Sequence, residues 1–389
     1  MISALHSFAA IGKSDMGFPV TLILLFLIFF VSPACAGNPA LNSRGLEQRI
    51  DFWKKVYVQY GADDIIIHDR IYVNLIYDVA TEATLDAKIT EIENALQEIR
   101  SNLNKPCALT PRAASISKSI AAQGLSLSAD LIDGLLSNIH QQAGIKERFR
   151  DGIIRSGRYV EKFREIMAKH GIPTELALLP LIESSFQNAR SKAGALGVWQ
   201  FVSGTGKSYL KINRKVDERL DAVRSTEAAA HLLKDNYRAL GTWPLAITAY
   251  NHGCNGMLRA QKLHGSDLPV IISEHSSPLF GYASMNYYCE FLAAVEVYEK
   301  YPQYFGKLTL DSPDSPAEKP TQLKALPPST RKAYVPSKRT AVAAARYKVR
   351  NGDTLSDIAQ RVGVPISHLM AKNKLKKPLI QSGQVLLIR

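Results

Sequence analysis

The stretch from 146 to 298 carries helix start and stop signals in close succession, and this pattern constrains the fold more than any other feature. Gly171 ends a predicted helix whose apolar residues recur every three or four positions, and Pro173 opens the next one at its first turn. Further helices are expected over 225–240 and 244–251, each followed by a glycine. Because little strand signal interrupts these helices, we expect a mainly α-helical domain here.

The preceding part of the chain is also expected to be helical. In 80–103 the apolar residues step by three and four, as on one face of a helix. The isoleucines of 65–67 are interpreted as a short apolar break, and another helix is predicted near 129–142. We therefore expect a helical N-terminal extension of residues 37–145, of undefined role. The apolar residues at helical spacing are Leu46, Ile50, Trp53 and Tyr57 in the first stretch and Leu85, Ile89, Ile92, Leu96 and Ile99 in the second.

Residues 1–36 are interpreted as a signal peptide for export. The uncharged run 18–31 is too short for a spanning helix, Lys13 supplies a positive charge before it, and 34–36 form a small-x-small cleavage site. Lipidation of Cys35 and simple cleavage both remain open, and lipidation would associate the protein with a membrane. We expect an exported protein of the periplasm or cell envelope.

The chain has 389 residues and a formal net charge of +13. Such a charge suits nucleic acid, an anionic membrane or an acidic polymer, and export without any nucleic-acid motif argues against the first. Cleavage after the signal leaves Cys107, Cys254 and Cys289, too few for a disulfide scaffold. A single Cys254–Cys289 bridge and free thiols both remain open. With no C-x-x-C, H-E-x-x-H or paired histidine spacing, neither a metal nor another cofactor is expected.

Composition changes again near the C-terminus. Residues 308–345 are rich in proline, and 321–346 hold six basic residues and no acid, which is typical of a semi-extended linker. Residues 346–389 then read as a compact β-α-α-β unit with a turn at 351–353. A unit this small is marginally stable alone, so we expect a binding module rather than an enzyme.

Glu183 is the residue with the clearest chemical potential. It follows the apolar residues of the stretch 176–186, LALLPLIESSF, and is itself followed by two serines. Apolar walls desolvate a carboxyl group and raise its pKa toward neutrality, as an acid needs in order to protonate a glycosidic oxygen at neutral pH. From this stretch alone, an exposed Glu183, or one capped by Ser184 at a helix end, remains an alternative.

Two later segments carry further candidates. In 191–201 the small residues suit close backbone approach, while Gln200 lies within an apolar run and must find hydrogen-bond partners. Tyr250 and Asn251 lie at a predicted helix C-terminus. Tyr250 is a candidate to orient the Glu183 carboxyl or to carry a sugar face, with a core tyrosine as the alternative.

These motifs, in their order and spacing, resemble the family 1 soluble-lytic-transglycosylase domain. Segments 217–229 and 280–288 are similar to its membrane-bound lytic transglycosylase D branch, and the resemblance covers about 149–297. It implies a lysozyme-like helical catalytic domain, assigned to 146–307, in a Gram-negative envelope. The matching motifs are Glu183-Ser184-x-Phe186, Gly197-Val198-Trp199-Gln200 and Ala249-Tyr250-Asn251-x-Gly253.

Carried over by position, the resemblance makes Glu183 the single catalytic acid/base and Tyr250 the residue that hydrogen-bonds or positions it. Ala283 stands where the wider family has the glutamate of an E-T-x-x-Y motif, whereas Tyr287 of that motif is retained. The residues assigned to substrate binding are Ser184, Ser191, Gln200, Tyr250, Asn251 and Tyr287.

The number of carboxylates bears on the mechanism. Ordinary glycosidases use two, whereas the motif around Glu183 offers one. The acidic cluster of 217–221 lies beside Arg219 and Arg224 and is interpreted as structural ion pairs. Together with the resemblance, this predicts cleavage of the MurNAc-GlcNAc bond without water, forming 1,6-anhydroMurNAc ends. A goose-type muramidase that hydrolyses the same bond and a non-catalytic peptidoglycan-binding protein are the alternatives.

The C-terminal unit resembles a LysM domain through a pattern that spans most of it. The resemblance implies binding of N-acetylglucosamine-containing glycans, so peptidoglycan is the expected partner of both units. The matching positions are Tyr347, Val349, Gly352, Asp353, Thr354, Leu355, Ile358, Ala359, Leu369, Asn373, Gly383 and Leu386.

Overall fold

The computed structural model describes residues 40–104, 108–277, 279–315, 321–322 and 346–349, and isolated residues and short runs between 355 and 388. The expected signal peptide, Cys35, Cys107 and most of the expected linker lie outside the described residues. Within the described part of the chain, no helix is both long and apolar enough to span a membrane.

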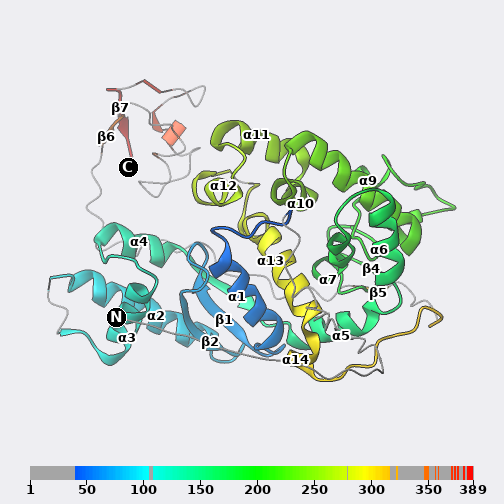
Figure 1. Ribbon diagram of the computed structural model, residues 1–389. Helices are drawn as coiled ribbons and strands as arrows, with labels where there is room; N and C mark the ends of the chain where they lie inside the picture. The colour runs from blue at the N-terminus through cyan, green and yellow to red at the C-terminus, as the bar shows by residue number, and fades with distance from the viewer. Residues whose placement is uncertain are drawn as a thin grey trace, which may run out of the picture.

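Helices make up most of the described structure, as Figure 1 shows. The α-helices are α1 (Glu47–Val58), α2 (Leu85–Ser101), α3 (Pro111–Ala122), α4 (Ala129–Ser137), α5 (Lys146–Ser156), α6 (Val160–Lys169), α7 (Pro180–Glu183), α8 (Ser203–Gly206), α9 (Ala222–Leu240), α10 (Trp243–His252), α11 (Cys254–His264), α12 (Leu268–Glu274), α13 (Tyr282–Glu299) and α14 (Tyr301–Phe305). The 3₁₀ helices are η2 (Thr174–Leu178) and η3 (Glu218–Leu220). The strands are β1 (Ile65–Asp69), β2 (Ile76–Ala80), β3 (Ile139–Ala143), β4 (Ala189–Arg190), β5 (Thr321–Gln322), β6 (Arg346–Lys348) and β7 (Val385–Leu387).

The isoleucine run is the central strand of a sheet, and not the short break expected from the sequence. β1 pairs antiparallel with β2 on one side and with β3 on the other. Successive side chains of a strand point to opposite faces. Accordingly Ile65 and Ile67 pack into an N-terminal core with α2, α3 and α4, whereas Ile66 packs into the larger helical core. The sheet therefore separates two hydrophobic cores, which explains why all three isoleucines are buried.

Helix α1 belongs to the larger core, across the boundary expected at residue 145. It lies against α13, as Figure 1 shows in blue and yellow. Arg49 Nη1 donates to Asn286 Oδ1 at 2.9 Å, and Tyr57 Oη donates to the Glu290 carbonyl at 3.1 Å. The N-terminal region thus supplies a helix that backs α13, in addition to a smaller core of its own.

Several helix boundaries differ from the expectation for identifiable reasons. The helix predicted over 129–142 ends at Ser137, because the chain then enters β3 and pairs with β1. The helix expected from Ser225 begins three residues earlier, because the Asp221 carboxylate accepts hydrogen bonds from the first-turn amides of Val223 and Arg224. Its predicted end at Gly241 is confirmed, with a φ of 77°.

The chain that follows α14 packs against the helical core. Asp311 forms an ion pair with Arg158 at 2.9 Å, and its amide donates to the Ile154 carbonyl. β5 then pairs in parallel with β4. The first residues of the expected 308–345 linker therefore pack against the helical core.

The C-terminal unit has the two outer strands that the sequence predicts. β6 and β7 pair antiparallel over a small core that includes Leu355, Ile358 and Leu369. The side-chain Nδ2 of Asn373 donates to the carbonyls of Leu369 and Leu387, and its Oδ1 accepts from the Leu387 amide. This side chain joins the segment around Leu369 to the last strand.

Candidate active site

Glu183 lies at the end of α7, against α13. Its Oε1 accepts a hydrogen bond from Tyr287 Oη at 2.5 Å. Pro180 and Leu181, which precede it on the short helix, are buried. Burial raises the pKa of Glu183 to about 7, although the Tyr287 hydrogen bond acts in the opposite direction. At neutral pH this carboxyl group is thus divided between its acid and base forms.

Three residues near Glu183 adopt a left-handed backbone conformation that residues other than glycine rarely take. Ser185, Phe186 and Gln200 have φ angles of 53°, 57° and 51°. Two arginines of α5 hold the first of these: Arg148 Nε donates to Ser185 Oγ and Arg155 Nε to the Ser185 carbonyl. Strain that surrounding contacts maintain is typical of functional sites. Its location here supports the choice of Glu183 as the reactive group.

Ser184 has a structural place that corrects the expectation of a sugar contact. Its side chain is fully buried, and its Oγ donates to the Val198 carbonyl at 2.7 Å. This bond ties the end of α7 to the Gly197-Val198-Trp199-Gln200 turn. The residue therefore connects two motifs inside the protein and does not reach the surface.

Side chains of the turn that contains Ser191 and Gln200 form hydrogen bonds with the backbone of the same turn. Ser191 Oγ accepts from the Ala195 amide at 3.0 Å, and Gln200 Nε2 donates to the carbonyls of Ala189 and Gly197. The partners required by Gln200 are therefore backbone carbonyls of this turn, while both side chains keep some exposure.

Gly197 is required within this turn. It has a φ of 82°, and a Cβ here would lie 1.8 Å from the Arg219 carbonyl oxygen. The close backbone approach predicted for the small residues is therefore confirmed at Gly197.

Tyr250 does not make the hydrogen bond expected of it. Its Oη donates to the Trp199 carbonyl at 2.8 Å, and the phenol that donates to Glu183 is Tyr287. Tyr250 is nevertheless near the carboxyl group, since the Glu183 charge adds to the effect of burial in raising the Tyr250 pKa. Asn251 is exposed at the end of α10, and its Oδ1 accepts from Ser284.

Glu290 is a carboxyl group of this site that the sequence analysis missed. It lies one turn after Tyr287 on α13, so both side chains leave the same face of the helix. Burial, and then the charge of Glu183, raise its pKa to about 8. In the sequence, only the three-residue spacing of Tyr287 and Glu290 pointed to a shared helix face. That this face lies beside Glu183 follows from the packing of α13 against α7.

The acidic cluster between the second and third motifs is structural, as predicted. Asp217 forms a two-pronged ion pair with the buried Arg219, at 2.9 Å and 2.7 Å. Arg219 also donates to the carbonyls of Gly194 and Phe201. Glu218 pairs with Arg224 at 3.6 Å. These groups hold the loop that contacts Gly197.

Within the described residues, Cys254 and Cys289 are free thiols, so the optional bridge between them is not formed.

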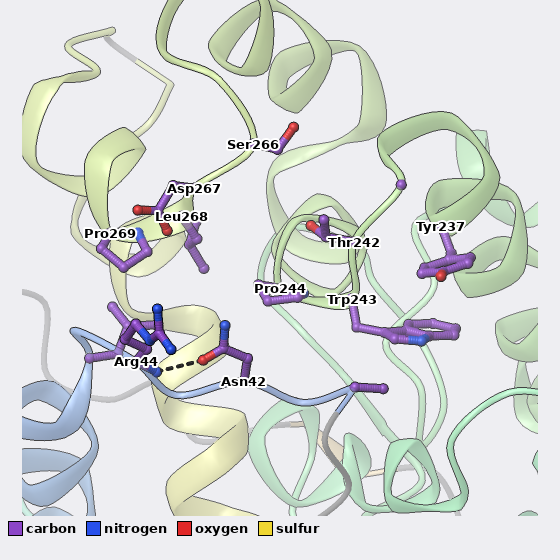
Figure 2. A pocket seen from close by; sticks show the side chains of 13 residues that line it. Asn42, Arg44, Tyr237, Thr242, Trp243, Pro244, Ser266, Asp267, Leu268 and Pro269 are labelled. Atoms are coloured by element: carbon purple, nitrogen blue, oxygen red, sulfur yellow. Dashed lines mark hydrogen bonds between the residues drawn. The ribbon is translucent and has the colours of Figure 1, made fainter.

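A cavity of about 290 Å³ lies away from Glu183, between the start of α1, the α9–α10 turn and the α11–α12 turn (Figure 2). Its wall includes Tyr237 stacked on Trp243 with ring centroids 4.4 Å apart. Glu183 is not among its lining residues.

Comparison with protein families confirms both resemblances. Residues 161–268 match the Transglycosylase SLT domain, and residues 347–389 match the LysM domain. The first match contains Glu183, Gln200 and Tyr250, and it ends before α13. The chain therefore carries a lysozyme-like SLT domain and a C-terminal LysM domain.

Three named relatives match parts of the chain. It is 29% identical to "Membrane-bound lytic murein transglycosylase D" of Escherichia coli (strain K12) over 302 aligned residues, which cover 62% of this chain and 66% of that protein. The same values hold for the protein of that name from Escherichia coli O6:H1. A "Putative tributyltin chloride resistance protein" of Alteromonas sp. (strain M-1) is 39% identical over 95 residues, or 24% of this chain and 46% of that protein. The chain thus spans just under two thirds of the E. coli relatives and is homologous to them over that span.

Proposed function

We propose that this chain, which carries an SLT domain and a C-terminal LysM domain, is a peptidoglycan lytic transglycosylase. In this proposal it cleaves the β-1,4 bond between N-acetylmuramic acid and N-acetylglucosamine without consuming water. The observation that carries the proposal is the Glu183 carboxyl, which burial brings to a pKa of about 7 while Tyr287 holds one of its oxygens. The homology to lytic murein transglycosylases supports the same reaction.

The proposed reaction uses one carboxyl group twice. Protonated Glu183 gives its proton to the glycosidic oxygen, the C1–O bond of the muramyl residue breaks, and the N-acetyl group of that sugar stabilises the cationic C1. The resulting carboxylate takes the proton of the muramyl 6-hydroxyl, whose oxygen then bonds to C1. Glu183 returns to its acid form, and the product ends in a 1,6-anhydro ring. The Tyr287 hydrogen bond stabilises the carboxylate between the two steps.

Glu290 fits this single-carboxylate scheme. Its pKa of about 8 keeps it protonated at neutral pH, so it does not supply a carboxylate nucleophile or a base. A neutral acid next to Glu183 also adds no negative charge that would prevent Glu183 from ionising after proton transfer. The second carboxyl group of the site is therefore compatible with non-hydrolytic cleavage.

The remaining site assignments are part of the same proposal. Ser191, Gln200 and Asn251 keep exposed surface near the motif turns and are proposed to contact the sugars. Tyr250 supports the Trp199 carbonyl and borders the same site. We propose that the LysM domain holds the glycan strand near the catalytic domain, which raises the local substrate concentration. The net charge of +13 suits the anionic cell-wall polymer.

The proposed setting is the bacterial envelope. The apolar run 18–31 supports export by a signal peptide into the periplasm of a Gram-negative bacterium. Cleavage after residue 36 and lipidation of Cys35 are separable by intact mass of the mature protein. The lipidated form would be heavier by its acyl chains and would sediment with membranes.

Digestion of purified sacculi tests the activity. The wild-type protein is expected to release fragments with anhydro ends, which are lighter than reducing ends by one water. Glu183→Gln is expected to lose about 10²–10⁴-fold in rate, the contribution typical of a general acid/base. Glu165→Gln is the matched control, since this glutamate pairs with Lys162 at the protein surface. Reducing ends would indicate a hydrolase, and an active Glu183→Gln would remove Glu183 from the chemistry.

A further inference from the structure

Three potential metal ligands meet where the end of α6 packs against α9, outside the site of Glu183. His170 directly follows α6, while Glu227 and His231 lie one turn apart on α9. One ligand atom from each residue can be chosen so that all three lie within 4.8 Å of one another. His170 Nε2 is 2.5 Å from Glu227 Oε2, and the His170 and His231 rings are 4.5 Å apart between centroids.

We propose that His170, Glu227 and His231 bind one Zn²⁺ ion that clamps the end of α6 to α9. Two imidazole nitrogens and one carboxylate oxygen are a ligand set that Zn²⁺ prefers, with water in the fourth position. Zinc–ligand distances near 2.0 Å place tetrahedral ligands about 3.3 Å apart. His231 is exposed, so its side chain has room to close the remaining distance.

Two lysines next to this cluster affect how tightly it can bind a cation. Lys169 Nζ lies 3.2 Å from Glu227 Oε1, whereas Glu227 Oε2 bonds to His170 Nε2, and the proposed ion would replace the proton between these two atoms. Lys234 Nζ donates to the His170 carbonyl at 2.7 Å and holds the backbone that presents the imidazole. The Lys169 side chain is 72% exposed and can turn into solvent when a cation binds. Both ammonium groups reduce the affinity without occupying the three ligand atoms.

The position of the cluster assigns a bracing role to the ion. From His170 the chain runs through η2 directly into α7 and Glu183. On α9, Thr226 adjoins Glu227 and accepts the buried Trp199 indole N–H at 2.7 Å. A metal clamp would therefore join the segment leading to Glu183 to the helix that holds the motif turn. We expect the bound ion to raise the stability of the protein and not to take part in catalysis, because none of its three ligands contacts Glu183.

Zinc titration of the full chain, free of affinity tags and stripped with EDTA, tests the site. Calorimetry is expected to show one saturable ion per chain, and Co²⁺ in its place is expected to give the visible absorption of a tetrahedral N/O site. A Zn²⁺ concentration about 100 times the Kd is expected to raise Tm by roughly 5 °C. His231→Ala, at an exposed position, should keep the metal-free Tm and weaken binding by at least about 10-fold.

The chain offers a matched control at the end of α11. His264 is partly buried and lies near Glu274 and His275, each 3.3 Å away, so it belongs to a second histidine-rich group. His264→Ala is expected to leave zinc affinity and the Tm shift unchanged. Glu227→Gln is the second test variant and should also lose the Co²⁺ spectrum. Absence of saturable binding, unchanged binding in His231→Ala, or loss of binding in His264→Ala would each overturn the proposal.

Discussion

The two sides of the candidate active site are built in opposite ways. Glu183 comes from a four-residue helix followed by Ser185 and Phe186 in left-handed conformations, held by arginines of α5. Tyr287 and Glu290 come from α13, an 18-residue helix that α1 backs along its other side. One side depends on a strained backbone that individual hydrogen bonds from α5 hold in place, and the other on the packing of two long helices. The proposed chemistry depends on both, because the hydrogen bond between Tyr287 and Glu183 joins them.

This contrast assigns different consequences to changes on each side. A change on the α7 side is expected to alter the reacting carboxyl directly. A change on the α13 side is expected to act through the pKa of Glu183 or through the stability of the helical core. Pairs of variants can therefore test whether the two sides are as distinct as their construction indicates.

The largest expected effect separates the two tyrosines. Tyr287→Phe removes the hydrogen bond to Glu183 and should lower kcat/KM by about 10–100-fold, as for bonds to charged groups. Because this bond lowers the Glu183 pKa, its loss should move the alkaline limb of the pH profile to higher pH. Tyr250→Phe removes a bond to a backbone carbonyl and should cost about 1 kcal/mol of stability without moving that limb. The reverse pattern would restore Tyr250 as the partner of Glu183.

The next effect concerns the pH dependence of the reaction. Because Glu183 must start protonated and its pKa is about 7, kcat/KM should fall about tenfold per pH unit above that value. An activity that rises through pH 8 would contradict this assignment.

The same raised pKa has a consequence for folding. A carboxyl whose pKa is higher in the folded protein contributes stability that is complete below its unfolded pKa and is lost as pH rises through about 7. Glu183→Gln should therefore match the wild-type Tm at pH 4 and exceed it at pH 8. Glu165→Gln should show no such pH-dependent difference, and a Glu183→Gln curve parallel to wild type would contradict the raised pKa.

A smaller effect tests the contact between α1 and α13. Arg49→Met leaves the fully buried Asn286 Oδ1 without its donor and should lower the free energy of unfolding by about 1–3 kcal/mol. Denaturant unfolding measures this loss. Arg150→Met is the control, since Arg150 pairs with Asp151 at the surface, and it should change stability by less than about 0.5 kcal/mol. Equal values for the two variants would show that α1 does not support α13.

The smallest effect is expected at Glu290. Because this carboxyl is already neutral below its pKa of about 8, Glu290→Gln should keep kcat/KM at pH 6 to 7 within about threefold of wild type. The raised pKa also predicts that the variant gains stability relative to wild type as pH rises from about 4.5 to about 8, with no further gain above that value. Loss of activity at pH 6 would make Glu290 a second catalytic carboxyl group and would favour a hydrolytic mechanism.

The α7 side was largely predictable from the sequence. An apolar run ending in Glu183, the glycine at 197 and the ordered motifs each carry their information within a few residues. The predicted pKa rise at Glu183 needed only its apolar neighbours. Ser184 was misplaced because its partner, the Val198 carbonyl, lies in the next motif and becomes accessible only when the turn folds back.

The α13 side was less predictable, because packing between segments far apart in the sequence decides which of its side chains reach Glu183. Which phenol reaches Glu183 is decided by how α13 lies against α7, whereas the resemblance, carried over by position, had given Tyr250 as the residue that hydrogen-bonds or positions Glu183. The isoleucine run was misread for a similar reason: its partner strands lie at 76–80 and 139–143. His170 and Glu227 are 57 positions apart and meet only where α6 packs against α9.

The central claim is that one carboxyl group serves as acid and then as base, with the muramyl 6-hydroxyl as the only nucleophile. Digestion of sacculi in water enriched in ¹⁸O tests this directly, with mass analysis of each new glycan end. The account predicts anhydro ends that contain no ¹⁸O in the products of the wild-type protein. Incorporation of one ¹⁸O atom at each new reducing end would show that water attacks C1 and would contradict it.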